Sequence, residues 1–380
     1  MAFYSHCQTS SDGTRKDTKL LQSHIAGVTE KVHTALNPEI NFTYSNEMLL
    51  RWLFTVTKFH DLGKYTDFFQ NYLFGCKTDQ DLKSHSFIGA ITAFYKFFPK
   101  EPDLAFLGYF LIRKHHGNLS HPKSDSFFYD EAEQARYVDI FDQQRKDLLQ
   151  KSQIIYDEIG EDLDNFFQYP ECRYFRKRAK KLTEKQPDIQ HYFLINYFFS
   201  LLLEADKLDA SDTPLYSRQD ISTKVVDDYL GKSVRQDMLN SGDLSNLTQN
   251  ELRDFSRAQV LSCLEYPEIL KQRLFTLTAP TVIGKTITSL DFAIRLKALI
   301  KHKEGYTPQI IYALPFINII EQNLNVYQQI FADYEEIQVL AHYQYADVFN
   351  GGKENLDEKA YNQRLMRLDT WQSDIVITSF

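Results

Sequence analysis

Apolar residues in the first 210 or so positions recur every three or four residues, the spacing of helices that pack one face on a core. No run of alternating apolar and polar residues, as a half-buried strand would show, occurs in this part. We predict four clear helices, at about 46–60, 84–98, 103–114 and 191–208. One face of the first carries Leu49, Trp52, Leu53, Val56 and His60. The pattern therefore predicts an all-α domain over residues 1–210.

The pattern changes after residue 250. Short apolar runs at 273–278, 309–313, 337–341 and 374–379 alternate with helical stretches at 251–264, 285–301, 316–331 and 354–368. Strands that alternate with helices of about 10–15 residues are typical of βαβ units and a parallel sheet. The stretch between the two patterns is polar. We therefore expect a polar linker at 211–250 and a parallel α/β domain over 251–380.

The composition is that of a soluble globular chain, with 43% hydrophobic and 14% aromatic residues. The first residues lack a basic region followed by an apolar core, and the longest apolar run, at 192–203, is too short to span a bilayer. The four cysteines are scattered, with no closely spaced pair. We therefore expect a cytoplasmic protein without disulfides, a thiolate zinc site or a membrane partner.

The net charge of −8 argues against a protein that coats duplex DNA with a basic surface. A local patch could still bind a single strand. Residues 173–181, Arg-Tyr-Phe-Arg-Lys-Arg-Ala-Lys-Lys, combine basic side chains with two aromatic ones. A solvated helix face would have the same composition, so both interpretations stay open.

A set of histidine and aspartate residues accompanies the predicted helices of the first domain. Its members are His24, His60, Asp61, His85, His115, His116 and Asp206. All but His24 fall at or near a helix end. Singly, each histidine has an ordinary explanation as a core side chain or a helix-terminal cation. As a set they indicate a metal site, because Asp206 continues a buried stripe where an unpaired carboxylate is costly.

The types of ligand in this set narrow the chemistry. Imidazole and carboxylate without thiolate suit Mn, Fe, Co, Ni or Zn, and Mg where oxygen ligands dominate. The set is larger than one ion needs, so we predict two divalent ions that share Asp61 as a bridging carboxylate. Two ions about 3.5–4 Å apart can polarise a phosphate and stabilise the leaving oxygen of an in-line displacement. The set therefore predicts phosphoester hydrolysis.

The stretch at 58–64, Lys-Phe-His-Asp-Leu-Gly-Lys, with the other members of the set before and after it, resembles the HD nuclease domain of the nuclease-helicases of type I CRISPR systems. The resemblance implies one ion on His24, His60, Asp61 and Asp206. It implies a second ion on Asp61, His85, His115 and His116. The implied catalytic residues are His60, Asp61 and Lys64, the last of them near a phosphate. The implied substrate is the single strand of DNA that a guide-RNA surveillance complex displaces during antiviral defence.

Residues 277–286, Leu-Thr-Ala-Pro-Thr-Val-Ile-Gly-Lys-Thr, resemble the phosphate loop of superfamily 2 helicases, between a predicted strand and a predicted helix. The residues that would bind ATP and its magnesium ion are Thr281, Gly284, Lys285 and Thr286. Val282 stands where that family has a glycine, and a β-branched residue disfavours the backbone conformation that the loop needs. Val282 therefore weakens the prediction of ATP binding.

Residues 311–322 and 374–380 resemble two further helicase motifs. The sequence then stops without an Asp-Glu box, a second motor domain or an arginine finger. The resemblance therefore implies an incomplete first RecA-like helicase domain. We expect no full ATP cycle in this chain by itself. Three origins stay open: a truncated gene product, an expressed fragment, or one piece of a split protein in which a separate chain supplies the rest of the motor.

Two other functions stay open on the sequence alone. One is an HD phosphohydrolase that acts on nucleotides or small phosphoesters. The other is a shortened, non-enzymatic chain that docks on the guide-RNA complex and regulates it. A nuclease would cut single strands with Mn, Co or Ni, whereas a nucleotide hydrolase would release phosphate from nucleotides. The sequence also leaves open the identity of the metal and the oligomeric state.

Overall fold

The structure, a computed structural model of the 380-residue chain, describes residues 2–9, 15–36, 40, 42–98, 100–121, 130–163, 172–184, 188–240, 244–343 and 358–379. The chain divides into two compact units, Met1–Leu215 and Tyr216–Phe380. Each unit has its own hydrophobic core and is described by itself.

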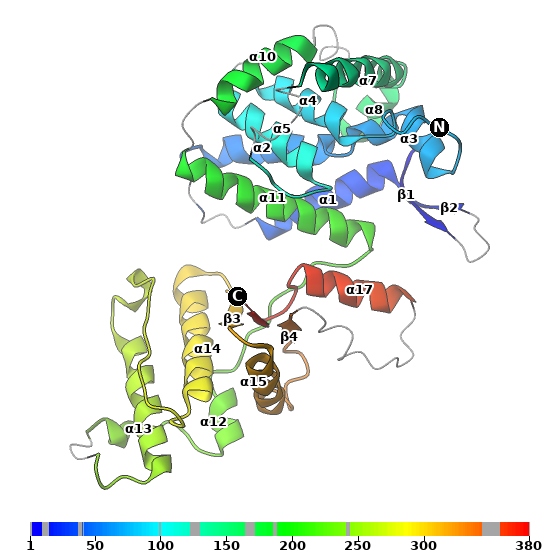
Figure 1. The fold of residues 1–380 in the computed structure, drawn as a ribbon. Helices are drawn as coiled ribbons and strands as arrows, with labels where there is room; N and C mark the ends of the chain where they lie inside the picture. The colour runs from blue at the N-terminus through cyan, green and yellow to red at the C-terminus, as the bar shows by residue number, and fades with distance from the viewer. Residues whose placement is uncertain are drawn as a thin grey trace. The chain divides into compact units, whose positions relative to one another are not determined.

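Helices make up most of the first unit (Figure 1). They are α1 (Leu21–Ala35), α2 (Asn46–Phe59), α3 (Asp67–Leu73), α4 (Ser86–Phe97), α5 (Pro102–Lys114), α7 (Glu131–Leu149), α8 (Ser152–Ile159), α10 (Cys172–Thr183) and α11 (Ile189–Ala210). A short 3-10 helix, η1 (Leu62–Tyr65), follows α2. The four predicted helices correspond to α2, α4, α5 and α11, with ends close to the expected positions.

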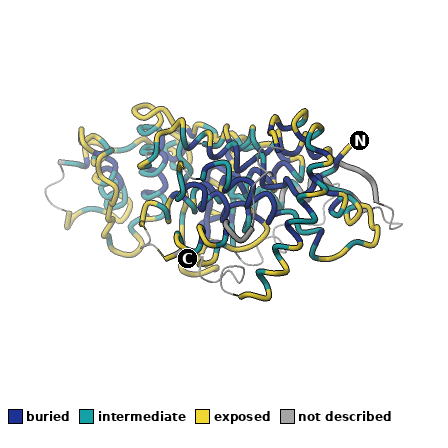
Figure 2. The backbone as a smooth tube through the Cα atoms, turned by 90° about the horizontal axis from the view of Figure 1, so that it is seen from above, coloured by how far each residue is buried: buried dark blue, intermediate teal, exposed yellow. Residues whose placement is uncertain are grey.

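The core of the first unit draws the ends of several helices together. Figure 2 shows buried residues, in dark blue, along the packed helices, and exposed residues, in yellow, both on loops and on parts of the helices. The indole nitrogen of Trp52 donates a hydrogen bond of 2.8 Å to Leu104 O, which ties α2 to the start of α5. A Cβ at Gly89 would lie 2.0 Å from Phe59 O, so only glycine allows α4 to approach the end of α2 this closely.

The first unit also contains a β-hairpin, so the prediction of a purely helical domain was wrong at its N-terminus. Strand β1 (Tyr4–Thr9) pairs antiparallel with β2 (Arg15–Leu20). Leu21 N donates to Phe3 O at 2.8 Å, which joins the hairpin to the start of α1. The sequence of β2, Arg-Lys-Asp-Thr-Lys-Leu, has no apolar alternation, and its backbone pairing with β1 defines this short strand.

The second unit contains a small parallel sheet. Its strands are β3 (Ile310–Leu314), β4 (Val339–His342) and β5 (Ile375–Ser379), in the order β3-β5-β4. Its helices are α12 (Val225–Leu230), η3 (Gln236–Asn240), α13 (Gln249–Ser262), η4 (Cys263–Glu265), η5 (Ile269–Lys271), α14 (Lys285–Glu304), α15 (Ile317–Ile330) and α17 (Glu358–Asp369). The predicted parallel sheet with alternating helices is confirmed for these elements. The predicted helix at 354–368 begins outside the described residues.

The strand predicted at 273–278 is absent. Residues 272–280 form neither helix nor strand, and Leu274 is 82% exposed. A strand exists only where a neighbour accepts and donates its hydrogen bonds, and the described strands pair with one another instead. The apolar run therefore reflected the β propensity of the segment, but it did not predict whether a neighbouring strand would pair with it.

The stretch 211–250 is not a linker throughout, because from Tyr216 onward it belongs to the second unit. Ile221, Val225 and Val226 are buried in the core of that unit. Tyr216 Oη and Gln219 N also donate hydrogen bonds to the buried carboxylate of Asp374, at 2.5 and 2.6 Å. These few residues sit in a polar sequence, and their burial depends on contacts with segments far along the chain.

The described part of the chain contains no helix that is both long enough and apolar enough to cross a membrane. The basic stretch at 173–181 lies on α10. Phe175 and Ala179 of this helix are buried, whereas Lys177, Arg178 and Lys181 are exposed. Lys177, Arg178 and Lys181 thus lie on the exposed face of an amphipathic helix.

Candidate metal centre

The seven predicted ligands come together in the first unit, mostly from helix ends. His24 lies in the first turn of α1 and Asp206 near the end of α11. His60 and His115 are the C-cap residues of α2 and α5, and His85 is the N-cap residue of α4. Asp61 and His116 directly follow two of these caps. Helix packing thus assembles in space a set that is scattered in sequence.

The seven residues form two groups that share one carboxylate. Within each group, one ligand atom per residue lies within 4.8 Å of the others. The first group consists of His24, His60, Asp61 and Asp206, and the second of Asp61, His85, His115 and His116. These are the same two sets that the family resemblance implied.

The first group is almost fully enclosed. His24 Nε2 lies 3.2 Å from Asp61 Oδ2 and 3.1 Å from Asp206 Oδ1. His60 Nε2 lies 3.4 and 3.8 Å from the same two oxygens. All four residues are buried.

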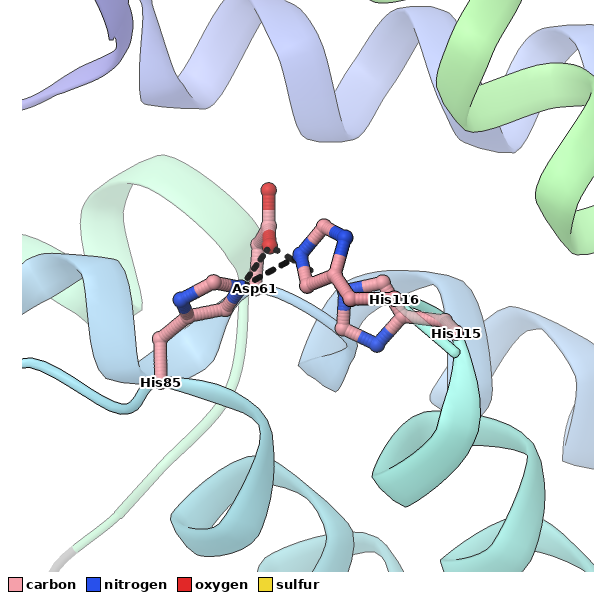
Figure 3. Close-up of side chains that lie close together, drawn as sticks. All are labelled: Asp61, His85, His115 and His116. Carbon is pink, nitrogen blue, oxygen red and sulfur yellow. Dashed lines mark hydrogen bonds and ion pairs between the residues drawn. The ribbon is translucent and has the colours of Figure 1, made fainter. Parts of the chain in front are cut away.

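The second group reaches the surface. Figure 3 shows its three imidazoles gathered around Asp61. His85 Nε2 lies 3.4 Å and His115 Nε2 3.7 Å from Asp61 Oδ1. His85 Nε2 and His116 Nε2 are only 2.7 Å apart, and His116 is exposed. His116 is therefore the exposed member of this group, whereas Asp61 and His115 are buried.

Hydrogen bonds outside the two groups fix the histidine rings. His60 Nδ1 donates to Thr57 O and His115 Nδ1 donates to Ile112 O, both at 2.6 Å. A carbonyl oxygen only accepts hydrogen bonds, so in both rings Nδ1 carries the proton. In the neutral ring the lone pair of Nε2 then points toward the ligand group to which the histidine belongs. His24 Nδ1 contacts Asp209 Oδ2 in the same way at 2.7 Å. Metal-ligating histidines commonly have such outer partners.

The buried atoms that face each group fit a bound cation. Nε2 of His24, His60 and His115 have no hydrogen-bond partner among the described residues, nor do the two oxygens of Asp61. Lys64 Nζ lies 2.7 Å from Asp61 Oδ2, as an ion pair without hydrogen-bond geometry. Buried polar atoms without partners are costly, and a divalent ion would accept all these lone pairs at once. Nitrogen and oxygen donors without thiolate suit Mn, Fe, Co, Ni or Zn.

The charges of the site favour metal binding. Burial raises the pKa of Asp61, but Lys64 and His60 outweigh it and hold that pKa well below its usual range. Burial likewise raises the pKa of Asp206, but the neighbouring imidazoles of His24 and His60 outweigh burial and hold that pKa well below its usual range. Burial lowers the pKa of His116 to about 4. The carboxylates are therefore anionic and His116 neutral at pH 7, as ligands must be.

His24 behaves differently while no ion is bound. Burial lowers its pKa, but the neighbouring carboxylates of Asp206, Asp209 and Asp61 outweigh burial and raise the pKa to about 10. A proton on His24 then balances the carboxylates. Because a ligand nitrogen must give up its proton, binding of an ion to the first group would release this one.

Three supporting residues were not predicted. Asp209 holds His24 and is itself paired with Lys19 and Lys31. Its position three residues after Asp206, on the same side of the helix, was the available signal. A Cβ at Gly27 would lie 2.0 Å from Asp209 Oδ1, so this glycine makes room for the contact. His6 of β1, a strand that was not predicted, packs against the ring of His24 at 5.0 Å.

Gly63, the glycine of the motif at 58–64, lies where a larger residue would not fit. A Cβ at Gly63 would lie 2.5 Å from the backbone of His85. Gly63 therefore lets η1 lie against the start of α4. This close approach places His85 beside Asp61.

The predicted phosphate loop lies in the second unit, before and within the first turn of α14. Gly284 has φ +84°, and Val282 also adopts a left-handed conformation, with φ +65°. Val282 is 67% exposed, and its carbonyl accepts a hydrogen bond of 3.0 Å from Arg253 Nε. Lys285 Nζ donates to Ala279 O at 3.0 Å. Thr281 and Gly284 thus lie in the loop before α14, and Lys285 and Thr286 are the first two residues of the helix.

Comparisons with known proteins, by sequence and by structure, both find similarity to Cas3 proteins. No family model matches the chain. The CRISPR-associated nuclease/helicase Cas3 of Haloferax volcanii is 25% identical over 156 residues, which are 40% of this chain and 16% of that protein. Crystal structures of T. fusca Cas3 match with TM-scores of 0.48 for the ATP form and 0.47 for the AMPPNP form, at 13% and 15% identity. Each match covers 100% of this chain and 43% of the solved chain.

The chain therefore spans less than half the length of the solved proteins that it matches. The segment similar to the Haloferax volcanii protein also spans only a small part of that relative. In sequence, therefore, part of the chain is similar to a CRISPR-associated nuclease/helicase Cas3.

Proposed function

We propose that the first unit is an HD-type nuclease that hydrolyses phosphodiester bonds of single-stranded DNA with two divalent metal ions. The observation that carries the proposal is the shared carboxylate. Asp61 belongs to both ligand groups, and both groups present buried lone pairs without partners among the described residues. A bridging carboxylate between two ions is a common arrangement for in-line displacement at phosphate.

The proposed roles follow from the geometry. His24, His60, Asp61 and Asp206 would hold one ion and Asp61, His85, His115 and His116 the other. When bound, the two ions would polarise the phosphate and activate water. Lys64 Nζ, 2.7 Å from Asp61 Oδ2, neutralises part of the charge on the shared carboxylate and keeps it in place. The exposed ring of His116 marks the side from which a strand enters.

For the second unit we propose an incomplete first RecA-like helicase domain. Its parallel sheet and the loop that leads into α14 support this assignment. Thr281, Gly284, Lys285 and Thr286 would hold ATP and magnesium. Val282 opposes this role, because a β-branched residue at φ +65° is strained. The guide-RNA surveillance complex of a type I CRISPR system is the proposed partner in antiviral defence.

The first prediction tests the nuclease. Purified chain with Mn²⁺ should cut a labelled single-stranded oligonucleotide, and Asp61→Asn should reduce cutting at least about 100-fold, because both ligand groups lose an anionic ligand. Metal content by mass spectrometry should fall in the same variant. His33→Ala, at an exposed ring outside the centre, is the matched control and should cut like the unmodified chain.

The outcomes separate the alternatives. Metal-dependent phosphate release from nucleotides without cleavage of the oligonucleotide would replace the nuclease by a nucleotide phosphohydrolase. Bound metal with neither reaction would favour the non-enzymatic regulator. Cleavage that survives Asp61→Asn would contradict the proposed site.

A further inference from the structure

Gln144 is a fully buried amide side chain that belongs to neither of the two ligand groups. It lies on α7, on the same face as Phe141 and Leu148, which are part of the hydrophobic core of the first unit. A buried amide is costly unless it is hydrogen-bonded, and an apolar residue would continue this face at no such cost. The contacts of the amide group explain why a polar side chain occupies this position.

The amide nitrogen of Gln144 holds the backbone just before His85. Nε2 donates to Leu82 O at 2.8 Å and to Ser84 O at 2.6 Å, so both of its N–H groups are used. Oε1 is buried without a hydrogen-bond partner among the described residues, so the amide contributes its donors. Residues 74–85, between α3 and α4, form turns and irregular backbone. Two hydrogen bonds from a packed helix therefore fix the end of this connection.

The ring of His85 depends on its backbone more than the rings of His60 and His115 do. Nδ1 of each of those two rings donates to a carbonyl one turn earlier in its own chain segment. His85 is instead the N-cap residue of α4, so no helical turn precedes it, and its side chain makes no capping hydrogen bond. Its ring packs edge-on against Phe69, with centroids 5.1 Å apart. That packing and the backbone before α4 set the position of the ring.

The position of the His85 ring decides whether the second ligand group converges. His85 Nε2 lies 3.4 Å from Asp61 Oδ1 and 2.7 Å from His116 Nε2 (Figure 3). Ligands must be held within about 0.5 Å of their productive geometry. We infer that Gln144 is a positioning residue of the second metal site, because it holds the backbone from which His85 reaches the same ion as Asp61. This inference rests on the two-ion centre of the proposed function.

The test removes both donors of the amide with little change in side-chain volume. Gln144→Met should weaken Mn²⁺ binding at the second site about 10-fold, the lower end of the loss expected when a ligand loses its outer support. The first site should stay within about twofold. Two-site calorimetric titration of the full chain measures both affinities. Gln143→Met is the matched control and should bind both ions like the unmodified chain, because the amide of Gln143 donates to Asp139 of its own helix, at 2.9 Å.

A double variant separates positioning of a ligand from general support of the fold. If Gln144 acts through His85, its replacement should matter little once that ligand is gone. In a chain that already carries His85→Ala, Gln144→Met should change the remaining Mn²⁺ affinities by less than about twofold. Gln144→Leu, a second apolar replacement with a different shape, should reproduce the selective loss at the second site.

The other outcomes contradict the inference or the centre on which it rests. Unchanged affinity at the second site in Gln144→Met would overturn the inference and leave the two-ion centre intact. Loss at both sites, or an equal loss in the His85→Ala background, would show that the amide supports the fold of the unit rather than one ligand. An unmodified chain that binds one Mn²⁺ ion or none would overturn the two-ion centre and this inference together.

Discussion

The carboxylate of Asp209 governs how His24 can serve as a ligand. It holds His24 Nδ1 at 2.7 Å and is anchored in turn by Lys19 and Lys31, at 2.7 and 3.0 Å. An anionic partner on one imidazole nitrogen fixes the ring and makes the other nitrogen a better donor to a metal. The whole arrangement depends on Gly27, where any side chain would collide with Asp209. Asp209 thus belongs to the centre although it touches no proposed ion.

Replacement of Asp209 by Asn should therefore weaken the first ion without removing a ligand. We expect about a 10- to 100-fold loss of Mn²⁺ affinity, the usual effect of removing an outer partner of a ligating histidine. Calorimetric titration of the purified variant measures it. Asp212→Asn is the control, since Asp212 also pairs with Lys19, at 3.1 Å, but is largely exposed. Equal losses in both variants would mean that Lys19, not the contact with His24, matters.

At the scale of an element, the loop before α14 combines a helix start with a strained residue. Two residues of this short loop, Val282 and Gly284, have positive φ, and only glycine adopts such angles without strain. The hydrogen bond from Arg253 to Val282 O helps to hold the conformation. The loop therefore has the left-handed shape at Val282 that a glycine would adopt more easily.

Val282→Gly should stabilise the second unit. Relief of the left-handed strain is worth about 1–2 kcal/mol, and the greater freedom of glycine in the unfolded chain removes about 0.5–1 kcal/mol of it. We expect a net gain in the free energy of unfolding of up to about 1.5 kcal/mol, measured by urea titration, and tighter ATP binding. Val282→Ala keeps a Cβ and should gain less. A loss of stability in Val282→Gly would show that the exposed valine makes contacts worth more than its strain.

At the scale of the whole molecule, the proposed metal centre and the phosphate loop lie in different units with separate cores. Every residue of the two ligand groups precedes Leu215, and the parallel sheet belongs wholly to the second unit. A metal that binds the folded first unit should stabilise that unit alone. We therefore expect each unit to unfold in a transition of its own.

Metal removal tests this division. Mn²⁺ at about 100 times its dissociation constant should stabilise the first unit by about 2.7 kcal/mol, and a chelator should reverse the effect. Differential scanning calorimetry should show one transition that moves with Mn²⁺ and one that does not. Asp61→Asn should abolish the shift. A single transition that moves as a whole would show that the two units unfold together.

Local patterns in the sequence were enough to predict the main helices, the parallel sheet and the seven residues that meet at the centre. Helical periodicity and end signals are properties of neighbouring residues, which is why α2, α4, α5 and α11 could be located. The division of these seven residues into two ligand groups came from the resemblance of the His and Asp motifs to the HD nuclease family. That these residues bind metal stays a prediction.

Tertiary structure alone decided the rest. The hairpin at Tyr4–Thr9 and Arg15–Leu20, and with it the place of His6, depends on backbone pairing that leaves no apolar pattern. The missing strand at 273–278 lacks a partner in the described sheet, and partners are chosen by the whole fold. Ile221 and Val225 are buried in a polar stretch because distant helices cover them. A sequence determines what each segment prefers, whereas contacts between distant segments decide which preferences are realised.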